Sequence, residues 1–175
     1  MQADLAILAG DRQPVQYLML ARRLPEKELV ISLIAGCYLA LPEDEFPRQA
    51  IGFIEYLVTR PGYQRQGHAS GLLQRLESEL QECAAARGER LSLVLGEIEP
   101  EMVAFKARRG YHQPSGSQYC QPPISFDEAT GQALSPPLPK LLMVKTWEAC
   151  VPADLLLGAV RTVFAKRYLP RRGTP

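Results

Sequence analysis

Histidine and closely spaced cysteine are scarce in this chain of 175 residues, which has only two histidines, His68 and His112. No Cys-x-x-Cys pair occurs, so the usual ligand set of a structural zinc site is missing and we expect no metal. A histidine-driven catalytic triad is disfavoured for the same reason. We expect the cysteines to be small, reduced core residues of a cytoplasmic protein. They are Cys37, Cys83, Cys120 and Cys150.

A surplus of either charge is also absent, because 20 basic residues face 19 acidic ones. Nothing therefore draws the whole chain to nucleic acid or to an acidic membrane. The basic C-terminal residues suit the negative end of a helix and lack an aromatic platform for bases. The first residues lack the basic and apolar regions of a signal peptide, and the run over 29–41 is too short to span a bilayer. We expect a single domain over 1–175, with no nucleic-acid or membrane partner.

Hydrophobic periodicity predicts a mixed α/β fold. Prolines crowd residues 114–139, so we expect an irregular loop there with a strand near 118–121. Tyr56 is expected in the core, and Gly88 and Gly110 are expected to end helices. On the last helix, Leu156, Val160, Val163 and Phe164 share one predicted face. The predicted strands cover 29–41 (one long strand, or two that meet near Gly36), 50–59, 91–95 and 140–147, and the predicted helices cover 15–23, 69–87, 100–109 and 152–168.

The most informative stretch joins the strand at 50–59 to the helix at 69–87. The strand breaks at Arg60-Pro61-Gly62 and a polar loop enters the helix. Backbone N–H groups and the positive end of the helix dipole then point the same way, which favours an anion. Gly67 and the small Ala69 let a ligand approach the backbone closely. The stretch predicts a phosphate site, although the Gly-x-Gly-x-x-Gly and P-loop patterns are absent.

Gln64, Gly67 and Ala69 resemble the acetyl-CoA loop of the GNAT acetyltransferase superfamily, whose pattern is Gln/Arg-x-x-Gly-x-Gly/Ala. Residues 104–111, ending in Gly110-Tyr111, resemble the second helix of that family, and the two blocks span 51–111. The resemblance implies the GNAT fold: a mixed, mostly antiparallel twisted sheet of about six or seven strands, split at Thr59/Leu91, with helices on both faces. The opening helices, which often wall the acceptor site in the family, look abbreviated here.

The same resemblance implies acetyl-CoA as co-substrate, an amine acceptor and a possible homodimer. In the family, main-chain groups of the broken strand pair with the pantetheine arm, and loop N–H groups hold the pyrophosphate. His68 is either a phosphate contact or simply the variable position of the motif. The residues implied for cofactor binding are Leu57, Thr59, Gln64, Arg65, Gln66, Gly67, His68, Ala69 and Ser70.

Proton handling has several candidates. Period-two alternation places Glu55 on one strand face with Ile51, Phe53, Leu57 and Thr59. Apolar neighbours would raise the pKa of Glu55, which makes it the first candidate for the base; the alternative is an exposed or ion-paired carboxylate.

Glu97 is a weaker candidate for the base. Lys106 occupies the position at which family members often place a tyrosine that acts as the general acid. Lys106 is either a proton donor or a solvated surface residue. Tyr119 is either an acid that reaches the site from the proline-rich loop or a packing residue.

We therefore expect an acetyl-CoA-dependent N-acetyltransferase in which a primary amine attacks the thioester directly in a ternary complex. The main alternative is a GNAT-like domain that binds CoA or a protein partner without turnover. Transfer of a longer acyl group, or transfer to a protein N-terminus or lysine, also stays open.

Overall fold

The structure, a computed structural model, describes residues 3–8, 15–23, 29–116, 118–123, 127 and 132–168. The chain forms two compact units, residues 1–95 (unit 1) and 96–175 (unit 2). The elements of unit 1 are β1 (Ala3–Leu8), β2 (Val15–Arg23), β3 (Leu29–Ala40), β4 (Gln49–Thr59), α1 (His68–Ala86) and β5 (Arg90–Ile98), of which the last three residues belong to unit 2.

The sheet of unit 1 has the strand order β1-β2-β3-β4-β5, and β1 to β4 run antiparallel to their neighbours. β5 begins beside the start of β4, because the N–H of Arg90 donates to the carbonyl of Arg48 at 2.8 Å. β4 and β5 are therefore parallel strands joined through α1, as predicted. Leu91 consequently lies at the opposite end of β4 from Thr59. The predicted position of the split, at Thr59/Leu91, is wrong.

Residues 15–23 form strand β2, so the predicted helix is wrong. Their apolar side chains fit a helix or a strand, but alternate residues are buried: Val15, Tyr17, Met19 and Ala21. Pairing with β1 on one side and β3 on the other decides in favour of the strand, since tertiary context overrides local propensity. None of the described residues before His68 is helical, and residues 9–14, which join β1 to β2, lie outside the described part of the chain.

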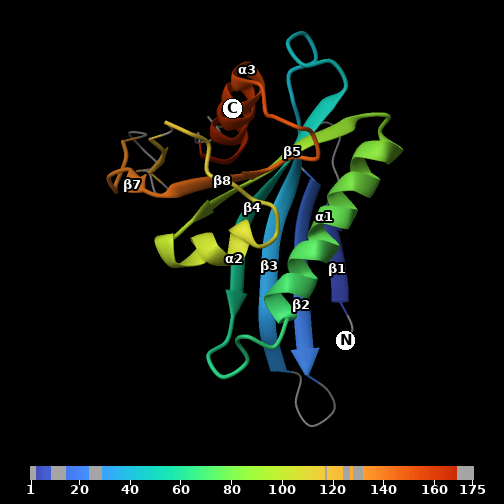
Figure 1. Cartoon of the computed structure of the whole chain (residues 1–175), viewed down its shortest axis with the longest axis vertical. Helices are drawn as coiled ribbons and strands as arrows, with labels where there is room; N and C mark the ends of the chain where they lie inside the picture. The colour runs from blue at the N-terminus through green and yellow to red at the C-terminus, as the bar shows by residue number, and fades with distance from the viewer. Residues whose placement is uncertain are drawn as a thin grey trace. The chain divides into compact units, whose positions relative to one another are not determined.

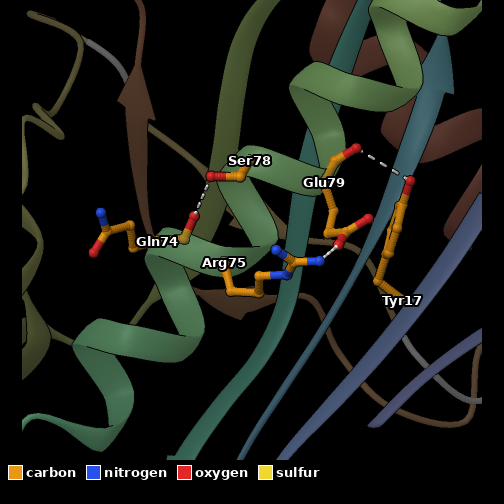
Figure 2. A network of polar contacts seen from close by, with 5 residues as sticks. All are labelled: Tyr17, Gln74, Arg75, Ser78 and Glu79. Carbon is orange, nitrogen blue, oxygen red and sulfur yellow. Dashed lines mark hydrogen bonds and ion pairs between the residues drawn. The ribbon is translucent and has the colours of Figure 1, made fainter. Parts of the chain in front are cut away.

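Helix α1 lies on one face of this sheet and packs against β2, β3 and β4 (Figure 1). Its buried stripe includes Leu72, Leu76 and Leu80, at the spacing predicted from the sequence, and Gly88 (φ 66°) follows its end. Polar contacts also tie the helix to the sheet (Figure 2). The hydroxyl of Tyr17 in β2 donates to the backbone carbonyl of Glu79 at 3.5 Å. The Glu79 side chain forms an ion pair with Arg75 one turn earlier.

A β-bulge in β4 changes which residues share a face. β3 is one long strand, and Gly36 pairs with Ile54 while Ala35 pairs with Tyr56, so Glu55 is the extra residue. Beyond the bulge, Tyr56 lies on the face away from α1 and is 64% exposed. The prediction that Tyr56 belongs to the core is therefore wrong.

The alternation predicted for β4 is wrong for the same reason. Phe53 pairs with Cys37, whereas Leu57 pairs with Ile34, an odd number of residues away on β3. Phe53 and Leu57 must therefore point to opposite faces. Leu57 and Thr59 lie on the face that carries α1, and Ile51 and Phe53 lie on the other.

Unit 2 contains a short helix that follows a 3-10 turn, a small ribbon and a C-terminal helix (Figure 1). The helix predicted over 100–109 is shorter than expected, because Arg108 to Gly110 form a turn instead. Its elements are η1 (Pro100–Met102), α2 (Val103–Ala107), β6 (Cys120–Gln121), β7 (Leu138–Pro139), β8 (Leu141–Lys145), α3 (Ala153–Val163) and η2 (Phe164–Tyr168).

Two predictions about side chains in unit 2 need correction. The buried face of α3 is centred on Leu155, Ala159 and Val163, one residue away from the predicted stripe at Leu156 and Val160. Cys37 is buried, as expected for a core cysteine, and Cys83 is half-buried, but Cys120 and Cys150 are exposed, so the prediction is wrong for these two. No helix in the described residues is long and apolar enough to cross a membrane.

We predict that Gly36→Ala destabilises the fold by about 1–3 kcal/mol, because overpacking forces the backbone to shift. An added Cβ would stand 2.7 Å from the carbonyl oxygen of Phe53 and 3.0 Å from Leu76 Cδ2. Urea unfolding measures the change. Ala40→Ser, at an exposed position of the same strand, is the control and should stay within about 0.5 kcal/mol of wild type. Equal stability of the two variants would contradict the close approach at the bulge.

Candidate functional site

The loop between β4 and α1 has an unusual backbone. Gly62, Arg65 and Gly67 have φ angles of 84°, 61° and 87°, in the left-handed region that favours glycine. The loop is held by its own bonds: Gln64 Nε2 donates to the carbonyl of Thr59 at 3.4 Å, and Gln66 Nε2 donates to the carbonyl of Gly62 at 3.1 Å. Both glutamines thus shape the loop, whose other side chains are mostly exposed.

The N-terminus of α1 opens directly from this loop. Gly67 is the N-cap, no side chain caps the helix, and its first turn contains no acidic residue. The N–H of Gly71 donates to the carbonyl of Gly67 at 2.9 Å. Backbone N–H groups of the first helical turn point towards this end of the helix, where the dipole favours negative charge. A Cβ placed on Gly67 would meet nothing within 4 Å, so the backbone is open to close approach.

The end of β4 is fixed against β3. Ser32 Oγ bonds Thr59 Oγ1 at 2.8 Å and donates to the carbonyl of Val58 at 2.9 Å. Arg60 donates from its backbone N–H to the carbonyl of Ile31 and from Nε to that of Val30, each at 2.9 Å. These bonds hold the strand end and the start of the loop in one position. Strand, loop and helix N-terminus are thus presented together by unit 1.

All the predicted cofactor-binding residues and Glu55 lie on this one strand–loop–helix segment. Glu55 is half-buried at the bulge, two residues before Leu57 and four before Thr59. A bulge re-aims side chains in its strand, and such bulges are common beside active sites. The segment can therefore present an anion site and a carboxylate a short distance apart along the same strand.

Unit 2 brings two other candidates together. The hydroxyl of Tyr119 donates to Oε1 of Glu97. Tyr168, which the sequence did not single out, donates from its hydroxyl to Oε2 of the same carboxylate at 2.6 Å and accepts a bond from Gln121 Nε2 at 3.1 Å. A tyrosine at the end of an amphipathic helix carries no local signal of such a partner. The carboxylate of Glu97 therefore has a phenol on each oxygen.

The surroundings of Tyr119 hold its proton in place. Burial, followed by the hydrogen bond to Glu97, raises the pKa of Tyr119 above its usual range. Its ring also packs against Phe164, with 6.0 Å between ring centroids, and Phe164 meets Tyr168 edge-on at 6.0 Å. A phenol with a raised pKa gives up its proton less readily, so these contacts favour the packing interpretation of Tyr119 over the acid.

Lys106 is buried, with an exposed fraction of 2%. The interpretation of Lys106 as a solvated surface residue is therefore wrong. Its Nζ lies over the ring of Tyr111, 4.2 Å from the centroid, and Lys145 Nζ lies 5.7 Å from the same ring. The face of an aromatic ring attracts a cation, so Tyr111 accounts for part of the stabilisation of this ammonium.

No group of three or more histidine, cysteine, aspartate or glutamate side chains in the described residues could hold a metal ion.

Comparison with known proteins places this geometry in context. A model of the acetyltransferase (GNAT) family matches residues 9–111. No curated protein matches the sequence.

Several solved structures share the fold at low identity. A putative GNAT-family acetyltransferase from Bacteroides thetaiotaomicron is 19% identical with a TM-score of 0.53, and the match covers 88% of this chain and 73% of that one. Arabidopsis thaliana NAA60 in complex with a bisubstrate analogue is 13% identical with a TM-score of 0.53, covering 80% and 78%. Chaetomium thermophilum Naa20 in complex with a bisubstrate analogue is 15% identical with a TM-score of 0.51, covering 74% and 65%. Together these similarities establish the fold.

We predict that stability falls at alkaline pH partly through Tyr119. Above a pH of about 10 the unfolded chain releases this phenolic proton while the folded chain keeps it, so the free energy of unfolding decreases as pH rises. Urea unfolding between about pH 9 and pH 11 should give a shallower decrease for Tyr119→Phe than for wild type. Tyr56→Phe, at an exposed position, should keep the wild-type slope. An unchanged slope in Tyr119→Phe would contradict the half-buried hydrogen bond with Glu97.

Proposed function

Because the chain belongs to the acetyltransferase (GNAT) family, we propose that it transfers an acetyl group from acetyl-CoA to a primary amine. Its fold is the mixed, mostly antiparallel GNAT fold. The observation that carries the proposal is the N-terminus of α1, which has no side-chain cap and no acidic residue in its first turn and opens from a loop with three positive φ angles. This is the arrangement that the diphosphate of coenzyme A requires.

The chain's own residues divide the work in this proposal. Amides of the loop and of the first turn of α1 bind the diphosphate, and Arg65 adds its charge at the exposed edge of the loop. Main-chain groups of Leu57 and Thr59 hold the pantetheine arm along β4. The Ser32 and Arg60 bonds keep that strand end rigid, because small displacements of a thioester cost large factors in rate.

The acyl transfer then requires one proton acceptor. The ammonium of the acceptor loses a proton to Glu55, and the free amine attacks the thioester carbonyl. A C–N bond forms and the C–S bond breaks, so the sulfur leaves as the thiolate of CoA. The nitrogen, positively charged after the attack, releases its second proton to solvent and the thiolate takes one up, which gives the amide and the free thiol. Two proteins of this fold have been solved with a bisubstrate analogue, which supports a fold able to hold both substrates at once.

A second candidate function is a GNAT-like domain that binds CoA or a protein partner without turnover. The observation in its favour is Lys106, which is buried against Tyr111 at the position where family members often carry an acidic tyrosine. Release of free CoA thiol distinguishes the two functions. Acetyl-CoA binding without thiol release across small amines and peptides would support the second one.

We predict that Gly67→Val abolishes acetyl-CoA binding in calorimetry, since a β-branched residue strains φ 87° and its side chain blocks approach to the amides. Gln64→Ala is the matched control in the same loop. Its bond to the Thr59 carbonyl is long, at 3.4 Å, so binding should weaken by less than about fivefold. Loss of binding in Gln64→Ala together with retention in Gly67→Val would overturn the role assigned to the backbone amides.

We predict that Glu55→Gln lowers kcat by about 10²–10⁴-fold, the usual contribution of a general base, while acetyl-CoA still binds. The rise of kcat/KM with pH that reflects ionisation of the base should disappear. The assay is thiol release from acetyl-CoA with a saturating amine, and Glu82→Gln, an exposed carboxylate on α1, is the control. An unchanged kcat and pH profile in Glu55→Gln would assign the base to another residue.

A further inference from the structure

An apolar surface remains open on the sheet of unit 1, on the face away from α1. It lies at the end of the sheet where β4 runs into the phosphate loop, and we call it the apolar shelf. The apolar shelf consists of Leu18, Leu20, Leu33, Ala35, Tyr56 and Val58.

Strand register shows that these six residues are contiguous. Leu18 of β2 pairs with Ala35 of β3, which pairs with Tyr56 of β4, and the next row is Leu20, Leu33 and Val58. Residues paired across strands share a face, so the two rows form one surface. Its outer members are strongly exposed: Leu18 45%, Val58 55% and Tyr56 64%.

Exposure on this face changes abruptly at the bulge. Towards the start of β4, Ile51 and Phe53, on the same face, are 0% and 2% exposed, and their partners Leu39 and Cys37 are also buried. The opposite face is covered by α1. The apolar shelf is thus the exposed continuation of a core surface, and none of its six side chains is charged. Across β2 its second row ends at Asp4 of β1, which pairs with Leu20. Contiguous apolar patches on soluble proteins are commonly interaction sites.

The size of the apolar shelf favours a small occupant. Two rows over three strands measure about 10 Å across the strands and about 7 Å along them. A stable dimer buries about 800 Å² on each partner, several times what such a patch offers. A second copy of the chain would therefore need most of its interface elsewhere. An extended segment of a few apolar residues matches the dimensions.

The location of the apolar shelf selects the kind of segment. Tyr56 directly follows Glu55, and Val58 lies two residues before Arg60, where the phosphate loop begins. Ser32 and Arg60 fix this end of β4, so the apolar shelf, Glu55 and the loop keep constant spacing. An occupant of the shelf therefore lies next along β4 to the residue that the proposed reaction uses as its base.

We infer that the apolar shelf receives the acceptor, and that the acceptor is a peptide amine flanked by apolar side chains. This inference rests on the proposed acetyl transfer, since it names the class of amine that the same site would take. Desolvation of the apolar residues supplies the selectivity: a peptide with polar residues next to its amine gains nothing from covering the shelf. A small polar amine would likewise leave it exposed.

The test uses two peptides of equal length, each with a free amino terminus and no lysine. Leucine and phenylalanine follow the amine in one, and serine and glutamine follow it in the other. Binding to the full chain with CoA present is followed by fluorescence polarisation, and thiol release from acetyl-CoA is measured separately. The variants are the double substitution Tyr56→Ser with Val58→Thr, both at exposed positions, and Leu157→Ser, an exposed leucine of α3 outside the apolar shelf.

We expect wild type and Leu157→Ser to bind the apolar peptide at least about tenfold more tightly than the polar one, and the double variant to lose that preference.

Equal binding of both peptides by wild type, or a preference that survives in the double variant, would overturn the inference. A wild-type dimer that the double variant converts to monomers in sedimentation would also overturn it, by assigning the shelf to contact between copies. If wild type prefers the apolar peptide but releases no thiol, the proposed acetyl transfer is rejected and the docking site is retained. If thiol is released and wild type binds both peptides equally, the acetyl transfer is retained and the docking site is rejected.

Discussion

The bulge at Glu55 is the constraint on which the rest of unit 1 depends. Gly36 allows the backbone of β4 to approach β3 so closely that a Cβ would meet the Phe53 carbonyl at 2.7 Å, and β4 accommodates one extra residue at this point. Side chains along a strand alternate between the two faces of the sheet, so one extra residue moves every later side chain of β4 to the opposite face. Leu57 and Thr59 turn towards α1, while Tyr56 and Val58 turn to the open face.

The position of α1 follows from the same sheet. The helix covers one face, with its buried stripe over β2, β3 and β4 and the Tyr17 contact at Glu79, so its axis is fixed and its N-terminus meets the end of β4. A strand end held by Ser32 and Arg60 and a helix end without a cap then meet in one short loop. The anion site that we propose would thus follow from how the helix packs on the sheet.

Sequence reasoning succeeded where local signals were strong. The breaks at Pro61 and Gly67 and the stripe of Leu72, Leu76 and Leu80 gave the loop and α1, and the family match confirms the resemblance that Gln64, Gly67 and Ala69 carry. It failed where distant contacts decide. Residues 15–23 are a strand because two neighbouring strands pair with them, and Tyr56 is exposed because the bulge exchanges faces. The union of Glu97, Tyr119 and Tyr168 joins segments far apart in the sequence, and no spacing rule predicts it.

The wide turn at Phe164–Tyr168 has a practical meaning for anyone who shortens this chain. A protein that stops at residue 163 would keep the whole of α3 and still lose both the Phe164 ring that packs against Tyr119 and one of the two phenols on Glu97. The helix boundary is therefore a poor guide to where unit 2 ends. Residues 164–168 are half-buried or exposed, yet two of them make these contacts, so an affinity tag or fusion partner belongs beyond residue 168.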